Sequence, residues 1–571
     1  MAASVAWLLG RPGNRSVRWP GHEHPQVDLR RPPLRDGHPP GLHGADRPVL
    51  RRVLIASADQ TSSGWYGAAA GALGAATALA VIEVLSLLDA TGDSVTEATG
   101  NSFINAFAAK LKEIAVRWFG TNDKAALLIG TAVVAIAIGA WLGTRAIRRP
   151  QTVITGFGVF AVLGIVLALD DPLASAWVSI LSSVAGASAG IGVTLGLARR
   201  WHGAVGTDHA GTTHGLARRQ VLVDGGITAF VLLVGVGIAR SAKSSARNVA
   251  TTVTRKLPRA TPKVTVPSGT LDKGATAIDG ISPYITPTAD FYRIDTLFRP
   301  PVVDPDTWTL TIKGMVDKEL TFTYDELLAR PLIEVPITLL CVSNEVGGNL
   351  VSTARFAGVP LADLLQEAGV QRGAKQVMGQ SVDGFTAGFP VEVALDGRDA
   401  LLAVGMNGHP LPAEHGFPAR LVVPGLYGYV SATKWIKEIR LTTWDEEGYW
   451  IPRGWSRLGP VKTSSRIDVP QSGSQVKAGK EAVAGVAWAT HRGIERVELQ
   501  VDDGPWRPAK LGPVASKDTW VQWWYEWEAT SGDHTLRVRA VDGKGRVQTA
   551  AEAPPDPNGS TGLHTIDVQV G

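Results

Sequence analysis

The chain has very little cysteine: Cys341 is the only one among 571 residues. A single thiol cannot close a disulfide within the chain, and it excludes a cysteine-rich zinc site and an all-cysteine iron–sulfur cluster. Cys341 ends an apolar run in the segment LLCVSNEVGG, residues 339–348. It is therefore an inert buried residue, a nucleophile or a metal ligand.

The chain is also low in charge. Charged residues make up 19% of the sequence and apolar residues 45%, a balance that indicates a membrane portion. The formal net charge of +4 is small for this length and does not point to nucleic-acid binding. At about 150 residues per domain, the length predicts about three to four domains.

The N-terminal part falls into two regions. Residues 1–60 are rich in Arg, Pro, Gly and His without a periodic apolar pattern, so we expect them to be disordered or an over-extended start of the reading frame. Residues 61–240 are predicted to form a transmembrane region of about five helices, each close to the ~20 residues that cross a bilayer core. The apolar stretches are 65–88, 125–147, 152–169, 174–198 and 221–239. Residues 103–120 predict an interfacial amphipathic helix instead.

Basic residues set the orientation of this region. They precede the first stretch, follow the second, and lie between the fourth and the fifth, whereas Asp170 and Asp171 lie between the third and the fourth. The positive-inside rule then places the N-terminus inside and residues after 240 outside. Arg240, Lys243 and Arg247 oppose this orientation, but the rule weakens before a long domain. We therefore expect a multi-pass protein of the cell membrane with its C-terminal half on the extracytoplasmic side.

Two further features concern export and electron transfer. The pair Arg218–Arg219 before the last stretch is either an ordinary set of positive-inside charges or a twin-arginine export signal, used for proteins that fold around a cofactor before export. The five apolar stretches contain no histidine, so a haem ligated by paired histidines within them is not expected. The stretches read as an anchor or a docking surface.

The C-terminal half reads as a linker and two domains. Residues 241–284 are polar and rich in Ser, Thr, Pro and Lys, which is typical of a linker. Residues 285–464 predict a mixed α and β domain, with strands at 308–316 and 420–424 and helices at 323–329 and 360–370. Residues 465–571 show successive alternating runs separated by Gly- and Asp-containing turns, the pattern of a β-sandwich.

The mixed domain carries a group of residues suited to an anionic ligand. The segment GMNGHPLPAEHGFPARLVVPGLYGYVSATKWI, residues 405–436, places His415, Arg420 and Lys434 around glycine-rich turns and a strand. Such a group suits a phosphate. A thiolate beside it indicates a phosphate-bearing cofactor whose metal is held by sulfur. A Cys–His protease is the alternative, although the basic group has no evident task in peptide hydrolysis.

Four segments in order resemble the sulfite oxidase family of molybdenum-cofactor (molybdopterin) oxidoreductases. They are TADFYRIDTLFRPPVVDPDTWTLTIKGMV, LLCVSNEVGG, MNGHPLPAEHGFPARLVVPGLYGYVSATKWIKEI and GVAWATHRGIERVELQVDDGPW. The resemblance covers residues 284–571, and the spans before it resemble a membrane-anchored bacterial subgroup. It implies a multi-domain protein with an N-terminal α-helical transmembrane bundle, a central α+β molybdopterin-binding domain of the sulfite oxidase fold, and a C-terminal immunoglobulin-like β-sandwich through which relatives dimerise.

The resemblance also implies roles for individual residues. Cys341 would be the protein ligand to molybdenum, a soft thiolate donor. His415, Arg420 and Lys434 would hold the pterin phosphate, and Arg293 would bind an oxyanion substrate near the metal. Further contacts to the cofactor are expected from Phe291, Tyr292, Arg293, Ser343, Asn344, Ser431 and Thr433.

Two departures from the family pattern leave the substrate open. Val404 stands where sulfite oxidases carry a tyrosine, and Glu345 stands where a basic residue is usual, which predicts a less positive pocket. Sulfite and a sulfoxide or N-oxide are therefore both candidate substrates, with a separate cytochrome or quinone-linked electron partner. The alternative is a catalytically inactive membrane binding or sensor protein with a sulfite-oxidase-like outer domain.

Overall fold

The computed structural model describes residues 47–104, 123–206, 213–251, 255–267 and 278–571. The chain divides into two units, residues 1–59 and residues 60–571. The first unit contributes only the beginning of one helix to the description. Everything else belongs to the second unit. Residues 1–46 of the predicted disordered region and residues 105–122 of the predicted amphipathic helix lie outside the described residues.

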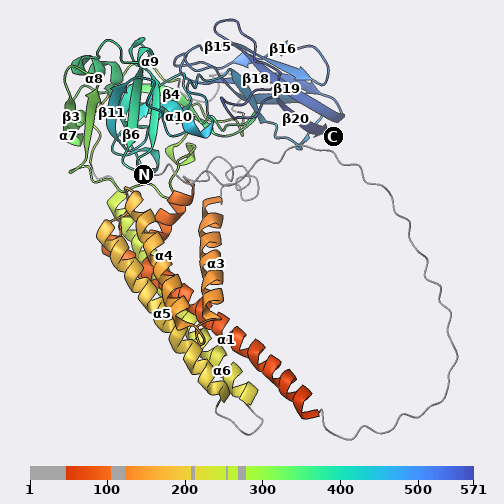
Figure 1. Cartoon of the computed structure of the whole chain (residues 1–571). Coiled ribbons are helices and arrows are strands. Elements are labelled where there is room, and N and C mark those ends of the chain that lie inside the picture. The colour runs from red at the N-terminus through yellow and green to blue at the C-terminus, as the bar shows by residue number, and fades with distance from the viewer. Residues whose placement is uncertain (1–46, 105–122, 207–212, 252–254, 268–277) are drawn as a thin grey trace, which may run out of the picture. The chain divides into compact units, whose positions relative to one another are not determined.

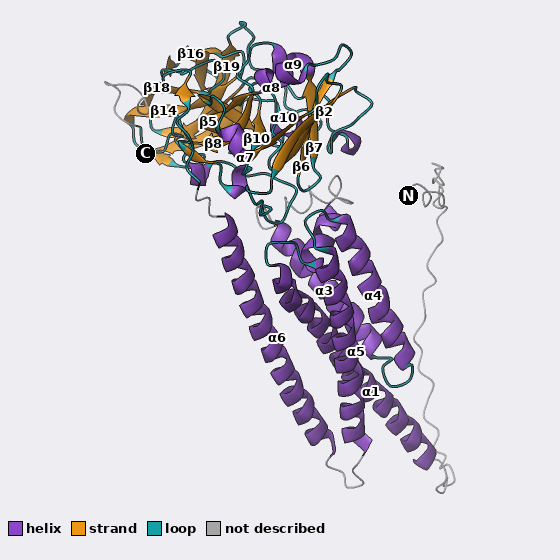
Figure 2. Ribbon diagram, turned by 90° about the vertical axis from the view of Figure 1, so that its left-hand side faces the viewer, coloured by secondary structure: helices purple, strands orange, loops and turns teal. Residues whose placement is uncertain are grey.

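Long helices form the N-terminal part (Figures 1 and 2). They are α1 (Arg47–Leu85), α3 (Asp123–Gly143), α4 (Pro150–Asp170), α5 (Ala176–Gly206) and α6 (Thr213–Thr251). Within the described residues, five helical segments are long and apolar enough to cross a membrane, which confirms the five predicted stretches. Two of the helices are longer than predicted. α1 begins at Arg47, so residues 47–60 are helical rather than disordered, and α6 continues into the predicted linker.

Glycines bring α1 and α3 into close contact at one end. Gly67 and Gly71 on α1 face Gly139 and Gly143 on α3, and a side chain at any of the four would collide with the opposite helix. Small residues four apart let helices approach this closely. The two helices are therefore pinned together at this end, whereas Gly130, three turns earlier on α3, has open space around it.

A buried ionic cluster lies where α6 nears its end. Lys243 Nζ is 2.8 Å from Glu97 Oε2, and Arg247 Nη2 is 2.9 Å from Asp93 Oδ1. All four side chains are less than a tenth exposed. Two of the three cations of α6 that oppose the predicted orientation are thus neutralised by carboxylates from the segment after α1.

Two sheets build the central domain. One has the order β1-β4-β5-β8-β10 with β9 paired to β8, and the other has the order β3-β2-β11-β6-β7. The strands of the first are β1 (Thr261–Pro262), β4 (Ile333–Leu340), β5 (Val351–Pro360), β8 (Leu401–Met406), β9 (His409–Pro410) and β10 (Arg420–Val422). Those of the second are β2 (Thr309–Gly314), β3 (Leu320–Thr323), β6 (Gln376–Ser381), β7 (Thr386–Pro390) and β11 (Ile436–Thr442). β1 lies within the predicted linker, which is therefore partly ordered.

Short helices connect these strands where the sequence carries start and stop signals. They are α7 (Tyr324–Leu328), α8 (Leu361–Ala368), α9 (Val391–Leu395) and α10 (Gly428–Ser431). The side chains of Thr323 and Glu326 form a reciprocal capping box at the start of α7. Gly369 ends α8 with a φ of +71°, a conformation that favours glycine. The four elements predicted in this domain are confirmed.

The C-terminal region consists of two further sheets, which confirms its predicted β character. Their orders are β12-β14-β18-β17 and β13-β20-β19-β15-β16. The strands are β12 (Ser464–Val469), β13 (Gln475–Val476), β14 (Gly479–Trp488), β15 (Ile494–Val501), β16 (Arg507–Pro508), β17 (Lys510–Leu511), β18 (Val521–Ala529), β19 (Gly532–Asp542) and β20 (His564–Val570). Side chains of both sheets share one core around the fully buried Trp523.

Candidate functional site

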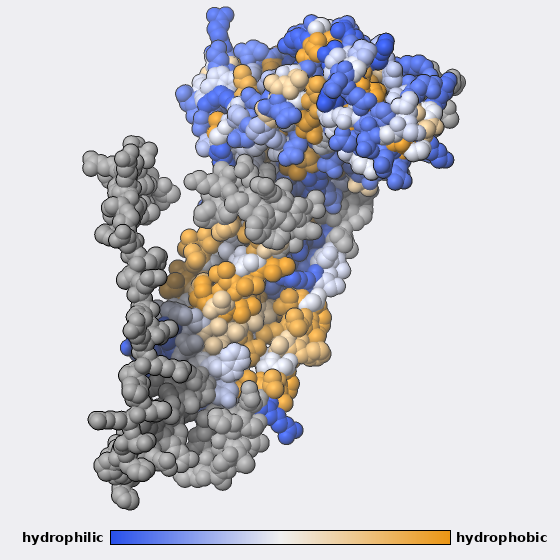
Figure 3. All heavy atoms as spheres, turned by 90° about the vertical axis from the view of Figure 1, so that its right-hand side faces the viewer, coloured by the Kyte–Doolittle hydropathy of each residue, from blue (hydrophilic) through white to orange (hydrophobic). Residues whose placement is uncertain are grey.

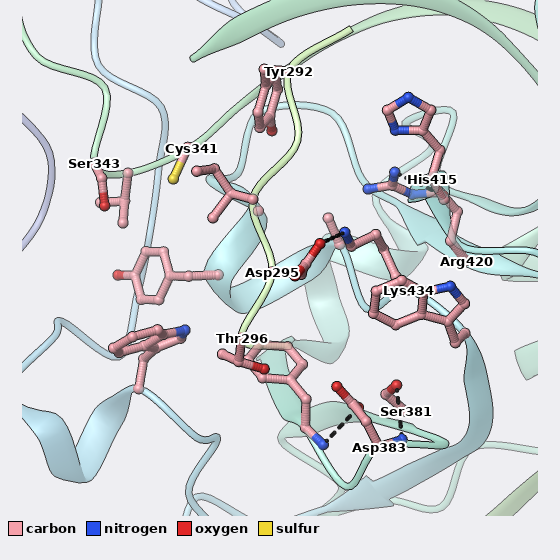
Figure 4. Close-up of a pocket in the computed structure, with 18 of the residues that line it drawn as sticks. Tyr292, Asp295, Thr296, Cys341, Ser343, Ser381, Asp383, His415, Arg420 and Lys434 are labelled. Carbon is pink, nitrogen blue, oxygen red and sulfur yellow. Dashed lines mark hydrogen bonds and ion pairs between the residues drawn. The ribbon is translucent and has the colours of Figure 1, made fainter. Parts of the chain in front are cut away.

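One pocket of the central domain gathers most of the predicted site residues (Figure 4). It encloses about 940 Å³, part of it open to solvent. Its walls come from residues 291–296, the segment after β4, the turn after β6, residues 415–435 and residues 450–455. Of the predicted set, Phe291, Tyr292, Cys341, Ser343, His415, Arg420 and Lys434 line it.

Cys341 lies at the point where β4 ends, and its sulfur faces the pocket (Figure 4). Its N–H donates to the carbonyl of Leu350 at 3.0 Å, and the Leu350 N–H donates to Asn344 Oδ1 at 2.7 Å. These bonds close the loop 341–350 on itself. Asn344 therefore fixes the shape of the loop that carries the thiol and does not line the pocket.

The C-terminal region holds the same loop from outside. Arg466 Nη1 donates to the carbonyl of Gly348 at 2.7 Å, and Ser560 Oγ donates to that of Asn344 at 2.6 Å. Gly347 has a φ of +77°, and a side chain there would collide with His564. This glycine makes room for a neighbouring domain rather than for a ligand.

Arg420 is a buried cation without an acidic partner. Its guanidinium donates to the carbonyls of His415 at 3.1 Å and Leu421 at 3.4 Å, and no carboxylate of the described residues lies within 4.0 Å of it. Burial lowers its pKa to about 10. A buried charge without a counter-charge is costly, so this position is incomplete without an anion.

His415 and Lys434 lie on the same side of the pocket. His415 Nε2 is 3.1 Å from the carbonyl oxygen of Thr288, which assigns the ring proton to Nε2. Burial, with the nearby charge of Arg420, lowers the pKa of His415 to about 4, so the ring is neutral at pH 7. Lys434 Nζ is 3.1 Å from Asp295 Oδ2, and burial lowers its pKa to about 8.

The remaining predicted residues lie outside the lining. Arg293 is exposed, and its Nε is 2.9 Å from Asp295 Oδ2, so it does not face Cys341. Ser431 Oγ donates to the carbonyl of Tyr427 at 3.0 Å. Thr433 is fully buried, and its hydroxyl has no hydrogen-bond partner among the described residues.

The structure adds residues that the motifs did not indicate. The further lining includes Asp295, Thr296, Ser381, Asp383, Phe385, Tyr429, Trp435, Trp450 and Trp455. Burial raises the pKa of the Asp383 carboxyl. Glu345 is exposed and absent from the lining, so it does not change the charge of the pocket wall. Asp295, which does line the pocket, pairs with Lys434. Val404 is fully buried in β8 and does not reach the pocket.

Comparisons with known proteins agree with this geometry. Residues 297–450 match the model of the oxidoreductase molybdopterin binding domain. Mitochondrial sulfite oxidase of Homo sapiens is 30% identical over 320 residues, 48% of this chain and 58% of the human protein. Sulfite oxidase of Arabidopsis thaliana is 28% identical over 329 residues, 47% of this chain and 83% of the plant protein. Among solved structures, the sulfane dehydrogenase SoxCD from Paracoccus pantotrophus has a TM-score of 0.43 and 24% identity, and covers 53% of this chain and 87% of its own.

Residues 297–450 are thus a molybdopterin-binding oxidoreductase domain. Within that class, the central region of this chain is similar to sulfite oxidases, the family that its motifs resemble. The chain spans 58% of the length of the human, macaque and rat relatives that it matches. The matched domain implies a molybdenum–molybdopterin cofactor.

The residues of the pocket fit that cofactor. A phosphate would supply the counter-charge that Arg420 lacks. Cys341 offers the soft donor that a metal with sulfur ligands prefers. The described residues contain no group of three or more His, Cys, Asp or Glu side chains able to hold a metal ion, so the metal would have to bring other ligands with it. A metal held by a sulfur-bearing pterin meets this condition.

Proposed function

We propose that the chain is a membrane-anchored, molybdenum-cofactor-dependent oxidoreductase that transfers an oxygen atom to or from a small molecule. The observation that carries the proposal is the shared pocket of Cys341 and the unpartnered cation Arg420. The cofactor supplies two-electron oxygen-atom transfer when it is bound. The residues of the chain provide its anchoring, the substrate cavity and the protons.

The basic side of the pocket would bind the pterin phosphate. Arg420 offers donors in a buried position, and Lys434 adds a second charge. The Nε2–H of His415 donates to the Thr288 carbonyl in the cofactor-free chain, so His415 would bind the phosphate by turning this N–H toward it. Cys341 would ligate the metal from the opposite wall. Phe291 and Tyr292 stack on each other with ring centroids 5.3 Å apart and would contact the pterin between these two anchors.

The other walls favour a neutral substrate. They are aromatic, with Tyr429 and Trp455 at 5.7 Å and Trp450 and Trp455 at 6.1 Å between ring centroids. Asp295 pairs with Lys434 and so offsets one of the two cations that line the pocket, which weakens the attraction for a dianion such as sulfite. A sulfoxide, or the thioether formed by its reduction, suits this surface because sulfur contacts aromatic rings favourably. An N-oxide carries no net charge either and is the second candidate. Reduction of a sulfoxide consumes two electrons and two protons and releases water.

The long apolar helices support a membrane location. On the face that Figure 3 shows, apolar side chains gather over the described helical part, and polar side chains predominate over the β-rich part. The five spans leave the domain outside when the N-terminus lies inside. The paired Lys243 and Arg247 remove most of the charge that opposed this orientation. Electrons would pass to or from a separate partner, and an immunoglobulin-like C-terminal domain could join two copies.

The test of this function is the molybdenum content of the purified full-length chain from a host that makes the cofactor. We expect near-stoichiometric metal in the wild type and an altered molybdenum spectrum in Cys341→Ser. Well-folded wild-type protein without molybdenum would overturn the proposal and favour a binding or sensing role. The intact set of Cys341, His415, Arg420 and Lys434 argues against that role.

A further inference from the structure

The helical part contains a second pocket, far larger than the first, to which the proposed chemistry assigns no task. It encloses about 1910 Å³, including its open side, and its walls come from α1, α3, α4, α5 and the helical residues 95–104. None of its lining residues carries a charge. The close contact of α1 with α3 explains its shape. The glycine pairs Gly67–Gly71 and Gly139–Gly143 pin the helices at one end, and they diverge toward the other (Figure 1).

One polar group in this pocket has no partner. Ser183 on α5 lines the cavity, is 2% exposed, and its hydroxyl has no hydrogen bond among the described residues. The lining hydroxyls of Thr99 and Thr131 differ, because they donate to carbonyls of their own helices at 2.7 and 2.9 Å. An unsatisfied buried hydroxyl costs free energy that a ligand with an acceptor oxygen would recover.

From this we infer that the pocket between α1, α3, α4 and α5 binds an isoprenoid quinone, with a ring carbonyl on the Ser183 hydroxyl. A phospholipid headgroup would need cationic partners, and the lining provides none. A quinone is neutral, has carbonyl acceptors, and carries a long apolar tail that matches the small apolar side chains of the walls. The choice among neutral lipids rests on the proposed function, which needs an electron carrier. The five candidate spans as described carry no histidine except His202 at the end of α5, so they cannot supply a pair of haem ligands.

The test is photolabelling of the full-length chain in nanodiscs with an azido-quinone, with competition by unlabelled quinone and mapping of the label by mass spectrometry. We expect saturable labelling on α3 and α5 around the cavity. Ser183→Ala should weaken competition about three- to ten-fold, the value of one hydrogen bond. Ala161→Phe fills the cavity and should abolish the saturable labelling. Val159→Phe is the matched control, because Val159 lies on the same helix, is 60% exposed and does not line the pocket.

Each result supports or overturns the assignment of a quinone to this pocket. Equal labelling of Ala161→Phe and Val159→Phe, or equally strong competition by diacylglycerol, would overturn the inference. So would wild-type protein that takes up no label. Cys341→Ser serves as a second control, since it should label like the wild type. A chain without molybdenum that still binds quinone would therefore refute the proposed function alone.

Discussion

At the scale of single residues, the most informative position is Arg420. In the cofactor-free chain it is a buried cation bonded only to carbonyls. Arg420→Met removes this unpaired charge, so we expect the cofactor-free variant to be no less stable than the wild type in urea unfolding. The same change should weaken cofactor retention by about 10- to 100-fold, the value of a charged hydrogen bond. Pterin fluorescence after oxidative release measures retention.

The control for this prediction is Arg440→Met. Arg440 lies on β11 and pairs with Glu438 and Glu446, away from the pocket lining. The Arg440→Met variant should retain the cofactor as well as the wild type does. Equal loss of pterin in both variants would contradict the role of Arg420, and so would a marked destabilisation of the cofactor-free Arg420→Met protein.

The carboxyl of Asp383 leads us to expect that kcat depends on pH. Burial raises the pKa of its carboxyl, so the carboxyl keeps its proton to a higher pH than an exposed aspartate. If Asp383 delivers a proton during sulfoxide reduction, kcat should fall as the pH rises through this pKa. Asp383→Asn should lower kcat and remove that fall. A pH–rate profile with the same alkaline limb in the variant would exclude Asp383 as the proton donor.

The residues of the site show what a sequence can and cannot reveal. The motifs predicted Cys341, His415, Arg420 and Lys434 because each stands in a short, dense pattern, and all four line one pocket. Arg293 and Asn344 lie in the same patterns but contact other protein groups, so their contacts to the cofactor stay predictions. Trp450 and Trp455 lie outside these patterns, and only tertiary packing brings them to the pocket of Cys341.

At the scale of elements, the contact of α1 with α3 gives the clearest prediction. A side chain at Gly139 would meet Ala75 and the backbone of Gly71. Gly139→Leu should therefore separate the two helices and destabilise the chain by about 1 to 3 kcal/mol, the usual cost of overpacking. Gly130→Leu lies on the same helix with open space around it and should have little effect. Thermal unfolding in detergent compares the two, and equal melting temperatures would rule out the close contact.

Element prediction succeeded where local signals were strong. The capping box of Thr323 and Glu326 and the left-handed Gly369 marked α7 and α8. The sequence around Gly347 gives no sign of the His564 ring, which leaves no room for a side chain at this position. Element prediction set the end of the last long helix too early, since α6 continues through polar residues that pair with Asp93 and Glu97.

At the scale of the whole molecule, the proposed topology makes an accessibility prediction. In a Cys341→Ser background the chain has no thiol of its own, so any labelling comes from the introduced cysteine. Asp503→Cys in the C-terminal region and Ala176→Cys at the first residue of α5 should react with an impermeant maleimide in intact cells. Thr144→Cys after α3 should react only after lysis. All three positions are exposed. Labelling of Thr144→Cys in intact cells would show that the chain has the opposite orientation in the membrane.

The order of the pocket walls along the chain has a consequence for biosynthesis. The walls come from segments between residues 291 and 455, and the loop of Cys341 is held by residues as late as Ser560. A ribosome must therefore finish almost the entire polypeptide before the cofactor has a complete cavity to enter. The five apolar helices are made first, and under the proposed topology they insert into the bilayer by then. Under the proposed topology, the domain would have to fold and bind its cofactor before it crosses the membrane. The pair Arg218–Arg219, the candidate export signal, lies at the start of the last helix before this domain.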